Sequence, residues 1–384
     1  MKKSILFITQ NLGRTGSEMV LWYLLKDLDP NQYSITLFCK SKGEMLDSLP
    51  SHIEKHILYK YNPNKWLRFY RKLIKFFGVN PIQHQLNIIQ QKSKANVWFV
   101  NTVAFPEIFE IDKPKNIKFF TYVHELLYAF SEIKRTTLEK AIAYSDVCIG
   151  CSDVVCNALL PIHHFVEKQY SFIDTDTIKV DLKVVNSLKK LHGILPTDFV
   201  WVVSGGTKYM KGFDLVLPIL DRFSEQNIKI LWLGSVIENG LTYYVKHIAD
   251  EKHPGKLICI GAEAENYYNY MAIANGFLLL SREETFSLVM LEAAYLQIPI
   301  VAFNVGVAAD FVKHEMGFVA YNNTLAEVLD GMDRIHEHSF INKEKLRDEA
   351  IRFNKNEQLP KFEQLLKKLF NVFSIFTLKI IFIY

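Results

Sequence analysis

The chain contains few cysteines and no long uninterrupted apolar run. Five cysteines in 384 residues are a small and odd number, as is typical of proteins in a reducing compartment. No run of about 18 apolar residues is present, which argues against a membrane-spanning helix. Met1-Lys-Lys-Ser leads straight into Ile5–Ile8, which is too short for the apolar core of a signal peptide. We therefore expect a cytoplasmic protein.

Metal-binding patterns are also scarce. Cys148 and Cys151 have the C-x-x-C spacing, but no second pair follows to complete a zinc site. Asp174 and Asp176 have the spacing of a metal-binding D-x-D pair, yet they lie at a predicted domain junction, which favours a structural role. We therefore predict no metal site and no cofactor.

One long stretch lacks acidic residues altogether. From Lys55 to Pro106 the chain carries +9, although its total net charge is only +4. Within residues 60–77 a helical pattern places basic residues on one side and apolar residues on the other: Lys65, Arg68, Lys72 and Lys75 against Trp66, Phe69, Tyr70, Leu73 and Phe77. Two interpretations stay open. The helix either binds an anionic membrane surface or packs its aromatic side chains on the domain core. Nucleic acid is not expected, because no recognition motif accompanies the charge.

Strand patterns and helical patterns alternate twice along the chain. Its length suffices for two globular domains, and 49% hydrophobic with 22% charged residues fits such domains. The predicted strands are Ile5–Thr9, Ile35–Cys39, Val97–Asn101, Lys118–Val123, Val147–Cys151, Phe199–Ser204, Ile230–Leu233, Leu257–Ile260, Phe277–Leu280 and Ile300–Phe303. This alternation predicts an α/β fold with two Rossmann-like domains, whose parallel sheets face each other across a cleft.

The segment after the strand Phe277–Leu280 predicts a ligand site. Glu284 follows this strand in a short loop, and ligands of open parallel sheets bind at the carboxyl ends of strands. Glu292 lies about two turns into the next predicted helix. An ionised carboxylate accepts two hydrogen bonds from neighbouring hydroxyls, so the pair suits a hydroxyl-rich ligand. The alternative is a helix with one acid near its N-terminus and one solvated acid.

Several short motifs occur in the order found in one enzyme family. The segment 281–293, with Glu284 and Glu292, resembles the E-x7-E block of the family 4 glycosyltransferases. Other resembling segments are Gly16-Ser-Glu18, Val123-His124-Glu125, Ser145–Ser152, Phe172-Ile-Asp174 and Lys211-Gly-Phe-Asp-Leu215. The resemblance implies the GT-B fold and a retaining, metal-independent hexosyltransferase that uses a nucleotide-sugar donor.

The resemblance also implies a role for each candidate residue. Lys211 would hold the donor diphosphate, Glu292 the ribose diol, and Glu284 the hydroxyls of the transferred sugar. His124 would lie by the reacting side of that sugar, so His124, Glu284 and Lys211 are the predicted catalytic residues. Gly16 and Glu18 would belong to a loop over the donor phosphates. The other donor-binding candidates offer backbone N–H groups, close backbone approach or a second cation: Gly205, Gly206, Lys208, Phe286, Ser287 and Leu288.

Three positions depart from the family pattern. Gly206 stands where the family usually has an arginine, and Lys208 is the nearby cation that would replace it. Ser287 stands where glycine is common, and Val307 replaces the second residue of a Gly-Gly turn, which narrows the space near the phosphates.

The expected domain limits combine these motifs with the composition. Residues 1–178 form the acceptor-binding domain, 179–198 a linker, and 199–345 the nucleotide-sugar-binding domain. Residues 346–370 form a helix that crosses back to the first domain. Three interpretations of the apolar tail 371–384 stay open: it lies in a membrane interface, it packs on the protein, or it is a non-native end.

Three functions remain as hypotheses. The first is a glycosyltransferase that acts on a glycan or lipid-linked acceptor in surface polysaccharide biosynthesis, peripheral to the inner face of the membrane. The second is a non-catalytic nucleotide-sugar-binding partner of a glycan-assembly complex. The third is a sugar-nucleotide epimerase, which shares the two-domain fold.

Overall fold

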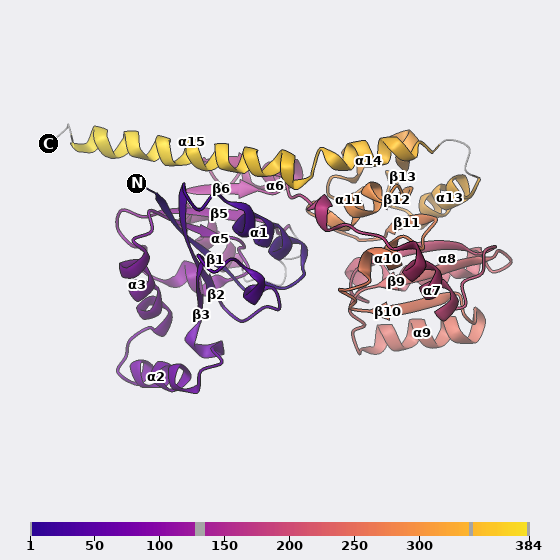
Figure 1. Cartoon of the computed structure of the whole chain (residues 1–384), viewed down its shortest axis with the longest axis horizontal. Helices are drawn as coiled ribbons and strands as arrows, with labels where there is room; N and C mark the ends of the chain where they lie inside the picture. The colour runs from indigo at the N-terminus through magenta and orange to yellow at the C-terminus, as the bar shows by residue number, and fades with distance from the viewer. Residues whose placement is uncertain (1, 127–134, 338–340, 382–384) are drawn as a thin grey trace. The chain divides into compact units, whose positions relative to one another are not determined.

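The computed structural model describes residues 2–126, 135–337 and 341–381, and the chain divides into two compact units. The first unit comprises residues 1–172 together with 355–384, and the second comprises residues 173–354. Each unit contains one parallel β-sheet accompanied by helices (Figure 1). The predicted α/β class with two Rossmann-like domains is therefore confirmed.

The sheet of the first unit has seven strands within the described residues, in the order β3-β2-β1-β4-β5-β6-β7, and all its pairings are parallel. Consecutive residues of β1 and β4 are buried, so both faces of the sheet are covered. The strands are β1 (Lys3–Thr9), β2 (Tyr33–Cys39), β3 (Glu54–Ile57), β4 (Val97–Val100), β5 (Lys118–Val123), β6 (Val147–Gly150) and β7 (Val166–Lys168).

The helices of the first unit connect these strands, and a last helix follows after the second unit. The α-helices are α1 (Gly16–Asp27), α2 (Lys65–Phe76), α3 (Pro81–Ser93), α5 (Arg135–Tyr144), α6 (Asp153–Leu159) and α15 (Lys355–Ile381). Short 3₁₀ helices are η1 (Leu46–Ser48), η2 (Tyr59–Tyr61) and η3 (Pro106–Glu110). Helix α15 packs on this unit, where the Phe362 ring lies edge-on to that of Phe99 at 5.5 Å.

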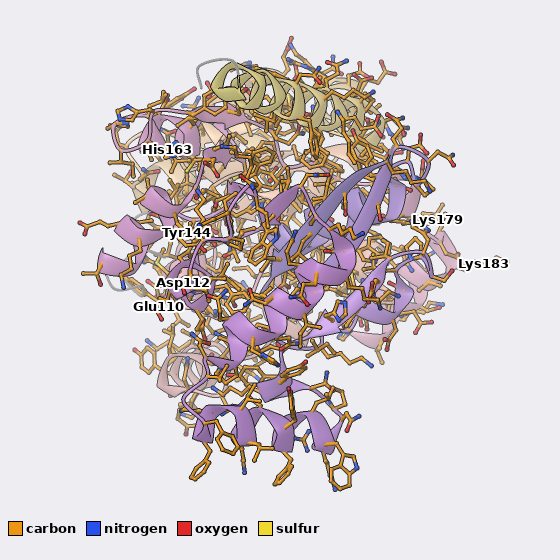
Figure 2. The ribbon with its side chains drawn as sticks, turned by 90° about the vertical axis from the view of Figure 1, so that its left-hand side faces the viewer. Glu110, Asp112, Tyr144, His163, Lys179 and Lys183 are labelled. Carbon is orange, nitrogen blue, oxygen red and sulfur yellow. The ribbon has the colours of Figure 1, made fainter. Side chains whose placement is uncertain are left out.

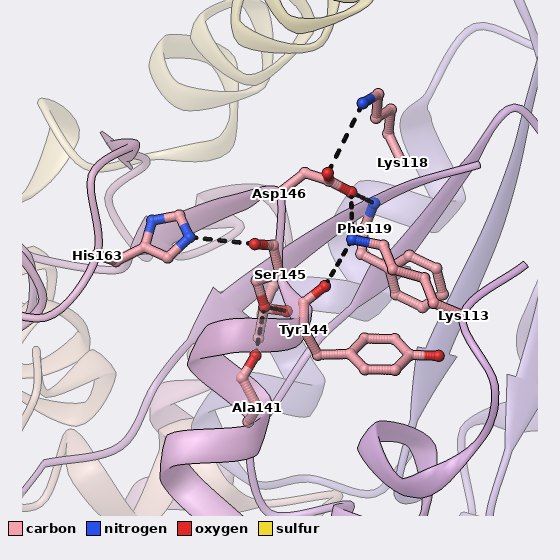
Figure 3. A network of polar contacts seen from close by, with 9 residues as sticks. Lys113, Lys118, Phe119, Ala141, Tyr144, Ser145, Asp146 and His163 are labelled. Atoms are coloured by element: carbon pink, nitrogen blue, oxygen red, sulfur yellow. Dashed lines mark hydrogen bonds and ion pairs between the residues drawn. The ribbon is translucent and has the colours of Figure 1, made fainter. Parts of the chain in front are cut away.

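The Ser145-Asp146 pair, from one of the resembling motifs, joins β5 to β6. The Asp146 carboxylate accepts a hydrogen bond from the Phe119 backbone N–H at 2.8 Å and lies 2.9 Å from Lys113 Nζ (Figure 3). The Ser145 hydroxyl donates to the Ala141 carbonyl at 2.7 Å. This motif therefore has a structural role in the first unit.

The sheet of the second unit has six strands within the described residues, in the order β10-β9-β8-β11-β12-β13, again all parallel. Its core contains Trp201 and Trp232 from neighbouring strands and Phe213 from the loop after β8. The strands are β8 (Phe199–Ser204), β9 (Ile228–Leu233), β10 (Leu257–Gly261), β11 (Gly276–Leu279), β12 (Ile300–Phe303) and β13 (Gly317–Ala320).

The second unit alternates these strands with helices. Its α-helices are α7 (Leu182–Leu191), α8 (Val216–Arg222), α9 (Gly240–Lys252), α10 (Tyr267–Met271), α11 (Leu288–Tyr295), α12 (Ala308–Phe311), α13 (Leu325–His336) and α14 (Lys343–Ile351). The 3₁₀ helices are η4 (Thr175–Thr177), η5 (Tyr209–Lys211), η6 (Phe213–Leu215) and η7 (His314–Met316).

All ten predicted strands are present, and three further strands, β3, β7 and β13, were not predicted. Each of the three is an edge strand of three or four residues. The residues of β3 and β7 are polar in part and only half-buried or exposed, so they lack the apolar run that marks a central strand.

The compact units divide after Phe172 and after Asn354, whereas the sequence-based limits fall at residues 178, 198 and 345. Helix α7, in the proposed linker, belongs to the second unit, where the N–H of its N-cap residue Asp181 donates to Asn269 Oδ1 at 2.8 Å. Helix α15 groups with the first unit. The side chains of residues 372–384 lie outside the described residues, so the role of the apolar tail stays open.

Gly276 gives a direct test of the β8–β11 packing. A Cβ at this position would meet the buried Trp201 ring at 2.3 Å, so Gly276→Ala should lower the free energy of unfolding by about 2 kcal/mol. Gly240→Ala is the matched control, because no atom lies within 4 Å of its added Cβ. Urea denaturation measures both variants, and equal stability of the two would contradict this packing.

Candidate functional site

The candidate site of the second unit begins at the paired carboxyl ends of β8 and β11. These two strands pair in parallel, with Gly276 opposite Trp201 and Phe277 opposite Val202. The loop after β8 contains Gly205 through Lys211, and the loop after β11 contains Arg282 through Glu284. The Arg282 N–H donates to the Met210 carbonyl at 2.9 Å, which joins the two loops.

Lys211 and Glu284 form an ion pair across these loops. Lys211 Nζ lies 2.5 Å from Glu284 Oε1, although the residues are 73 positions apart in the sequence. Gly205, at φ 152°, lies against the aliphatic part of Lys211, since an added Cβ would approach that side chain to 3.2 Å. The predicted phosphate-binding cation and the predicted sugar-binding carboxylate are therefore brought together. An anionic ligand at Lys211 would compete with Glu284.

Glu292 lies in the second turn of α11 and is buried. Tyr267 and Tyr268 of α10 donate their hydroxyls to its two carboxylate oxygens, each at 3.1 Å. The Tyr267 hydroxyl is also 2.8 Å from the hydroxyl of Ser204, the last residue of β8. Burial raises the pKa of Glu292 to about 7, against the opposing effect of the two tyrosine hydroxyls.

Ser287 precedes α11 and has a strained backbone. Its φ of 83° and ψ of 81° lie in a region that L-residues other than glycine rarely adopt. Its hydroxyl is buried and has no hydrogen-bond partner among the described residues. The first N–H groups of α11 have no acceptor inside the helix, as at any helix N-terminus. The unpaired Ser287 hydroxyl therefore lies at the N-terminus of α11, where the free backbone N–H groups already favour an anion.

Arg282 organises the loop after β8 and received no role from the sequence analysis. Its guanidinium binds both carboxylate oxygens of Asp214, at 2.9 and 2.7 Å, and lies 3.7 Å from the centre of the Tyr209 ring. These contacts fix η5, which carries Lys211. Asp214 and Arg282 lie inside two quoted motifs, but nothing in either motif pairs them.

The first unit contains a separate polar cluster around His124, directly after β5. His124 Nε2 donates to Asn101 Oδ1 at 3.3 Å, and its backbone N–H donates to Glu125 Oε2 at 2.9 Å. Glu125 also accepts the Thr102 hydroxyl. Burial lowers the pKa of His124 to about 3, so its ring is neutral at physiological pH. Burial raises the pKa of Glu125.

The loop before α1 is held by Glu18. This buried carboxylate accepts the Gly13 N–H at 3.1 Å, and burial raises its pKa. Asn101 Nδ2 donates to the Ser17 carbonyl at 3.1 Å, which links the start of α1 to the His124 cluster. Gly16 is exposed at the first position of α1. The predicted residues Gly16 and His124 thus belong to one connected region of the first unit.

The remaining donor-site candidates occupy different surroundings in the second unit. Lys208 is exposed just before η5. The side chain of Phe286 is buried edge-on against Phe353, so it can offer a ligand only its backbone. A Cβ on Gly206 would meet Ser235 Oγ at 3.2 Å. Leu288 is the first residue of α11. Tyr267 and Tyr268 were missed because their contact with Glu292 is tertiary.

No metal-binding group of three or more His, Cys, Asp or Glu side chains occurs among the described residues. Asp174 and Asp176 form a local turn, in which Asp174 accepts the Asp176 N–H at 3.2 Å to cap η4. Cys148 and Cys151 are both buried. Across residues 2–126, 135–337 and 341–381, no helix has the length and apolar character needed to cross a membrane.

The two parallel sheets define the class of protein. The structure resembles Anabaena HepE in complex with UDP (TM-score 0.75, 17% identity, 96% of this chain and 100% of that one). It also resembles a sucrose-phosphate synthase from Thermosynechococcus elongatus (TM-score 0.77, 16% identity, 97% and 100%). These likenesses show the GT-B fold.

Sequence comparison then gives the family. Residues 185–356 match the model for glycosyl transferases group 1, so the chain carries a domain of that family. The predicted family is thereby confirmed, and its family 4 subclass stays a prediction. A curated relative, the N-acetyl-alpha-D-glucosaminyl L-malate synthase of Bacillus anthracis, is 27% identical over 179 residues. That match covers 45% of this chain and 45% of the relative, less than half of either.

The raised pKa of Glu292 gives a test of its burial. Below pH about 4.5 the carboxyl is protonated in both states, and its burial costs little. As the pH rises through 7, the unfolded chain releases the proton more readily, so stability is lost. Glu292→Gln removes this loss. Its free energy of unfolding should exceed that of wild type by about 3 kcal/mol at pH 8, but by much less at pH 5. Urea denaturation at both pH values measures the difference. The exposed Glu265→Gln serves as control, and parallel pH dependence of Glu292→Gln and wild type would contradict the assignment.

Proposed function

We propose that this protein is a retaining, metal-independent hexosyltransferase that moves a sugar from a nucleotide-sugar donor to a glycan or lipid-linked acceptor in surface polysaccharide biosynthesis. The observation that carries the proposal is the juxtaposition of Lys211, Glu284 and the start of α11 with the buried Glu292. The group 1 family match over the same residues supports it.

The donor would bind in the second unit through three sets of contacts. Lys211 and the first N–H groups of α11 would bind the diphosphate, because both present positive charge or dipoles to an anion. Glu292 would accept hydrogen bonds from the ribose diol, and Glu284, released from Lys211, would accept them from the transferred sugar. Tyr267 and Tyr268 position Glu292 for this role.

In the proposed reaction, the bond between the sugar C1 and the diphosphate oxygen breaks while the acceptor oxygen forms a bond to C1 on the same face. The acceptor proton passes to the departing diphosphate oxygen. Fixed positive groups around that oxygen stabilise the developing negative charge without a metal. His124, whose ring is neutral and hydrogen-bonded to Asn101, keeps its predicted role beside the reacting side of the transferred sugar.

Donor binding tests this proposal first. Since HepE was crystallised with UDP, UDP-sugars are the first choice, with GDP-, ADP- and CMP-sugars alongside. Lys211→Ala and Glu292→Ala should each weaken binding about 10- to 100-fold, because each removes charged hydrogen-bonding partners. Isothermal titration measures the affinities, and Lys246→Ala, an exposed lysine on α9, should bind like wild type. Unchanged affinity in the first two variants would refute the assigned site.

Ser287 yields a prediction in which stability and binding move in opposite directions. Ser287→Gly relieves the left-handed backbone and should raise the free energy of unfolding by about 1 kcal/mol. The same change removes a hydroxyl proposed to bind the diphosphate, so donor affinity should fall about fivefold. Ser287→Ala keeps the backbone strain but should show the same loss of affinity. Calorimetry of both variants decides, and unaltered affinity in both would exclude Ser287 from the donor site.

A non-catalytic donor-binding partner is the second candidate, favoured by Gly206 in the place of the usual arginine and by the Lys211–Glu284 ion pair. Sugar transfer by the isolated protein, lost in Glu284→Ala, would rule it out. An epimerase would convert the nucleotide sugar with no acceptor present. Unchanged sugar transfer in EDTA would support a metal-independent mechanism. A product bond at C1 with the same axial or equatorial configuration as in the donor would support a retaining one.

A further inference from the structure

Helix α2 exposes an apolar face that the first unit leaves uncovered. We define the aromatic face as Trp66, Phe69, Leu73, Phe76 and Phe77. Trp66 is 79% exposed, Phe76 84% and Phe77 71%, values far above those of ordinary apolar side chains in a folded domain. The interpretation in which these side chains pack on the domain core is therefore wrong. A cluster of this kind marks an interaction surface.

Contacts on the other side of α2 fix the direction in which the aromatic face points. Ile74 is the buried residue of the helix, and the Tyr70 hydroxyl lies 3.0 Å from His84 Nε2 of α3. Asn64 caps the helix by accepting the Trp66 N–H at 2.9 Å. Figure 1 shows α2 at the end of the first unit opposite α15, and in Figure 2 its outward side chains point away from that unit. The aromatic face is thus held outward by the fold.

Basic residues flank the aromatic face. The segment 60–77 contains six Lys or Arg and no acidic residue: Lys60, Lys65, Arg68, Arg71, Lys72 and Lys75. Arg68 donates to the carbonyls of Asn62 and Pro63. Across the described part of the chain, no carboxylate pairs with Lys65, Arg71, Lys72 or Lys75. The partner must therefore bring both negative charge and an apolar interior.

We propose that α2 docks this protein on an anionic lipid bilayer, with the aromatic face in the acyl boundary and the basic residues on the headgroups. Tryptophan and phenylalanine suit that depth, and long basic side chains reach the headgroup phosphates. A second copy of the chain is disfavoured as the partner, because two such segments would bring six positive charges each into contact. The inference stands apart from sugar transfer, since docking needs no donor.

Vesicle flotation of the full chain, without donor, tests the docking. Wild type should bind vesicles of phosphatidylcholine with about 30% phosphatidylglycerol and lose this binding in about 0.5 M salt or without the anionic lipid. Trp66→Ser/Phe76→Ser/Phe77→Ser should lower the partition coefficient at least about tenfold. Lys65→Gln/Lys72→Gln/Lys75→Gln should lower it about 100-fold. Unchanged circular dichroism spectra would show that the variants fold.

The matched control is Tyr243→Ser/Tyr244→Ser, which removes two exposed aromatic side chains from α9 and should bind like wild type. Because Trp98, Trp201 and Trp232 are buried, and the background of the half-buried Trp22 can be measured in a Trp66→Phe variant, Trp66 also reports insertion. Its emission should shift to shorter wavelength on vesicles, and lipids with spin labels near the headgroup should quench it. Full binding by either α2 variant, binding to RNA but not vesicles, or a Trp66 emission that vesicles leave unchanged would each overturn the proposal.

Discussion

The candidate site depends on one constraint, the parallel pairing of β8 with β11. This register places the carboxyl ends of the two strands side by side, so that the loop carrying Lys211 meets the loop carrying Glu284. Gly276 makes the pairing tight, because only a residue without a Cβ fits against Trp201. Arg282 then joins the loops through Asp214, at distances typical of a bidentate pair. The contacts proposed for Lys211 and Glu284 follow from this geometry.

The same region contains polar groups whose burial and backbone strain lower the stability of the fold. Glu292 is a buried carboxylate whose pKa is raised to about 7, and Ser287 combines a strained backbone with an unpaired buried hydroxyl. Such features persist where the surrounding structure holds them in place, and they gather at binding sites. A nucleotide sugar would offset them by giving Glu292 diol donors and Ser287 a phosphate acceptor. Donor binding would thus explain why Glu292 and Ser287 hold polar groups in unfavourable surroundings.

Much of the fold followed from the sequence, because central parallel strands are apolar on both faces and stand out as short apolar runs such as Phe199–Ser204. The edge strand Val166–Lys168 did not, since half-exposed strands lack that signal. Glu284, Glu292 and Lys211 were selected as candidates through local motifs. Their partners Tyr267, Tyr268 and Arg282 were not, because hydrogen bonds between distant segments leave no local pattern. The two-sided pattern of residues 60–77 was visible, but only the structure showed that its aromatic side is exposed as well.

The most direct test of the central claim is a crystal structure of the protein with a UDP-sugar. The account predicts that Lys211 leaves Glu284 and binds a diphosphate oxygen at the start of α11, with the ribose hydroxyls on Glu292. It also predicts that the Ser287 hydroxyl gains a phosphate partner. A nucleotide bound elsewhere on the second unit, with the Lys211–Glu284 ion pair intact, would contradict the account.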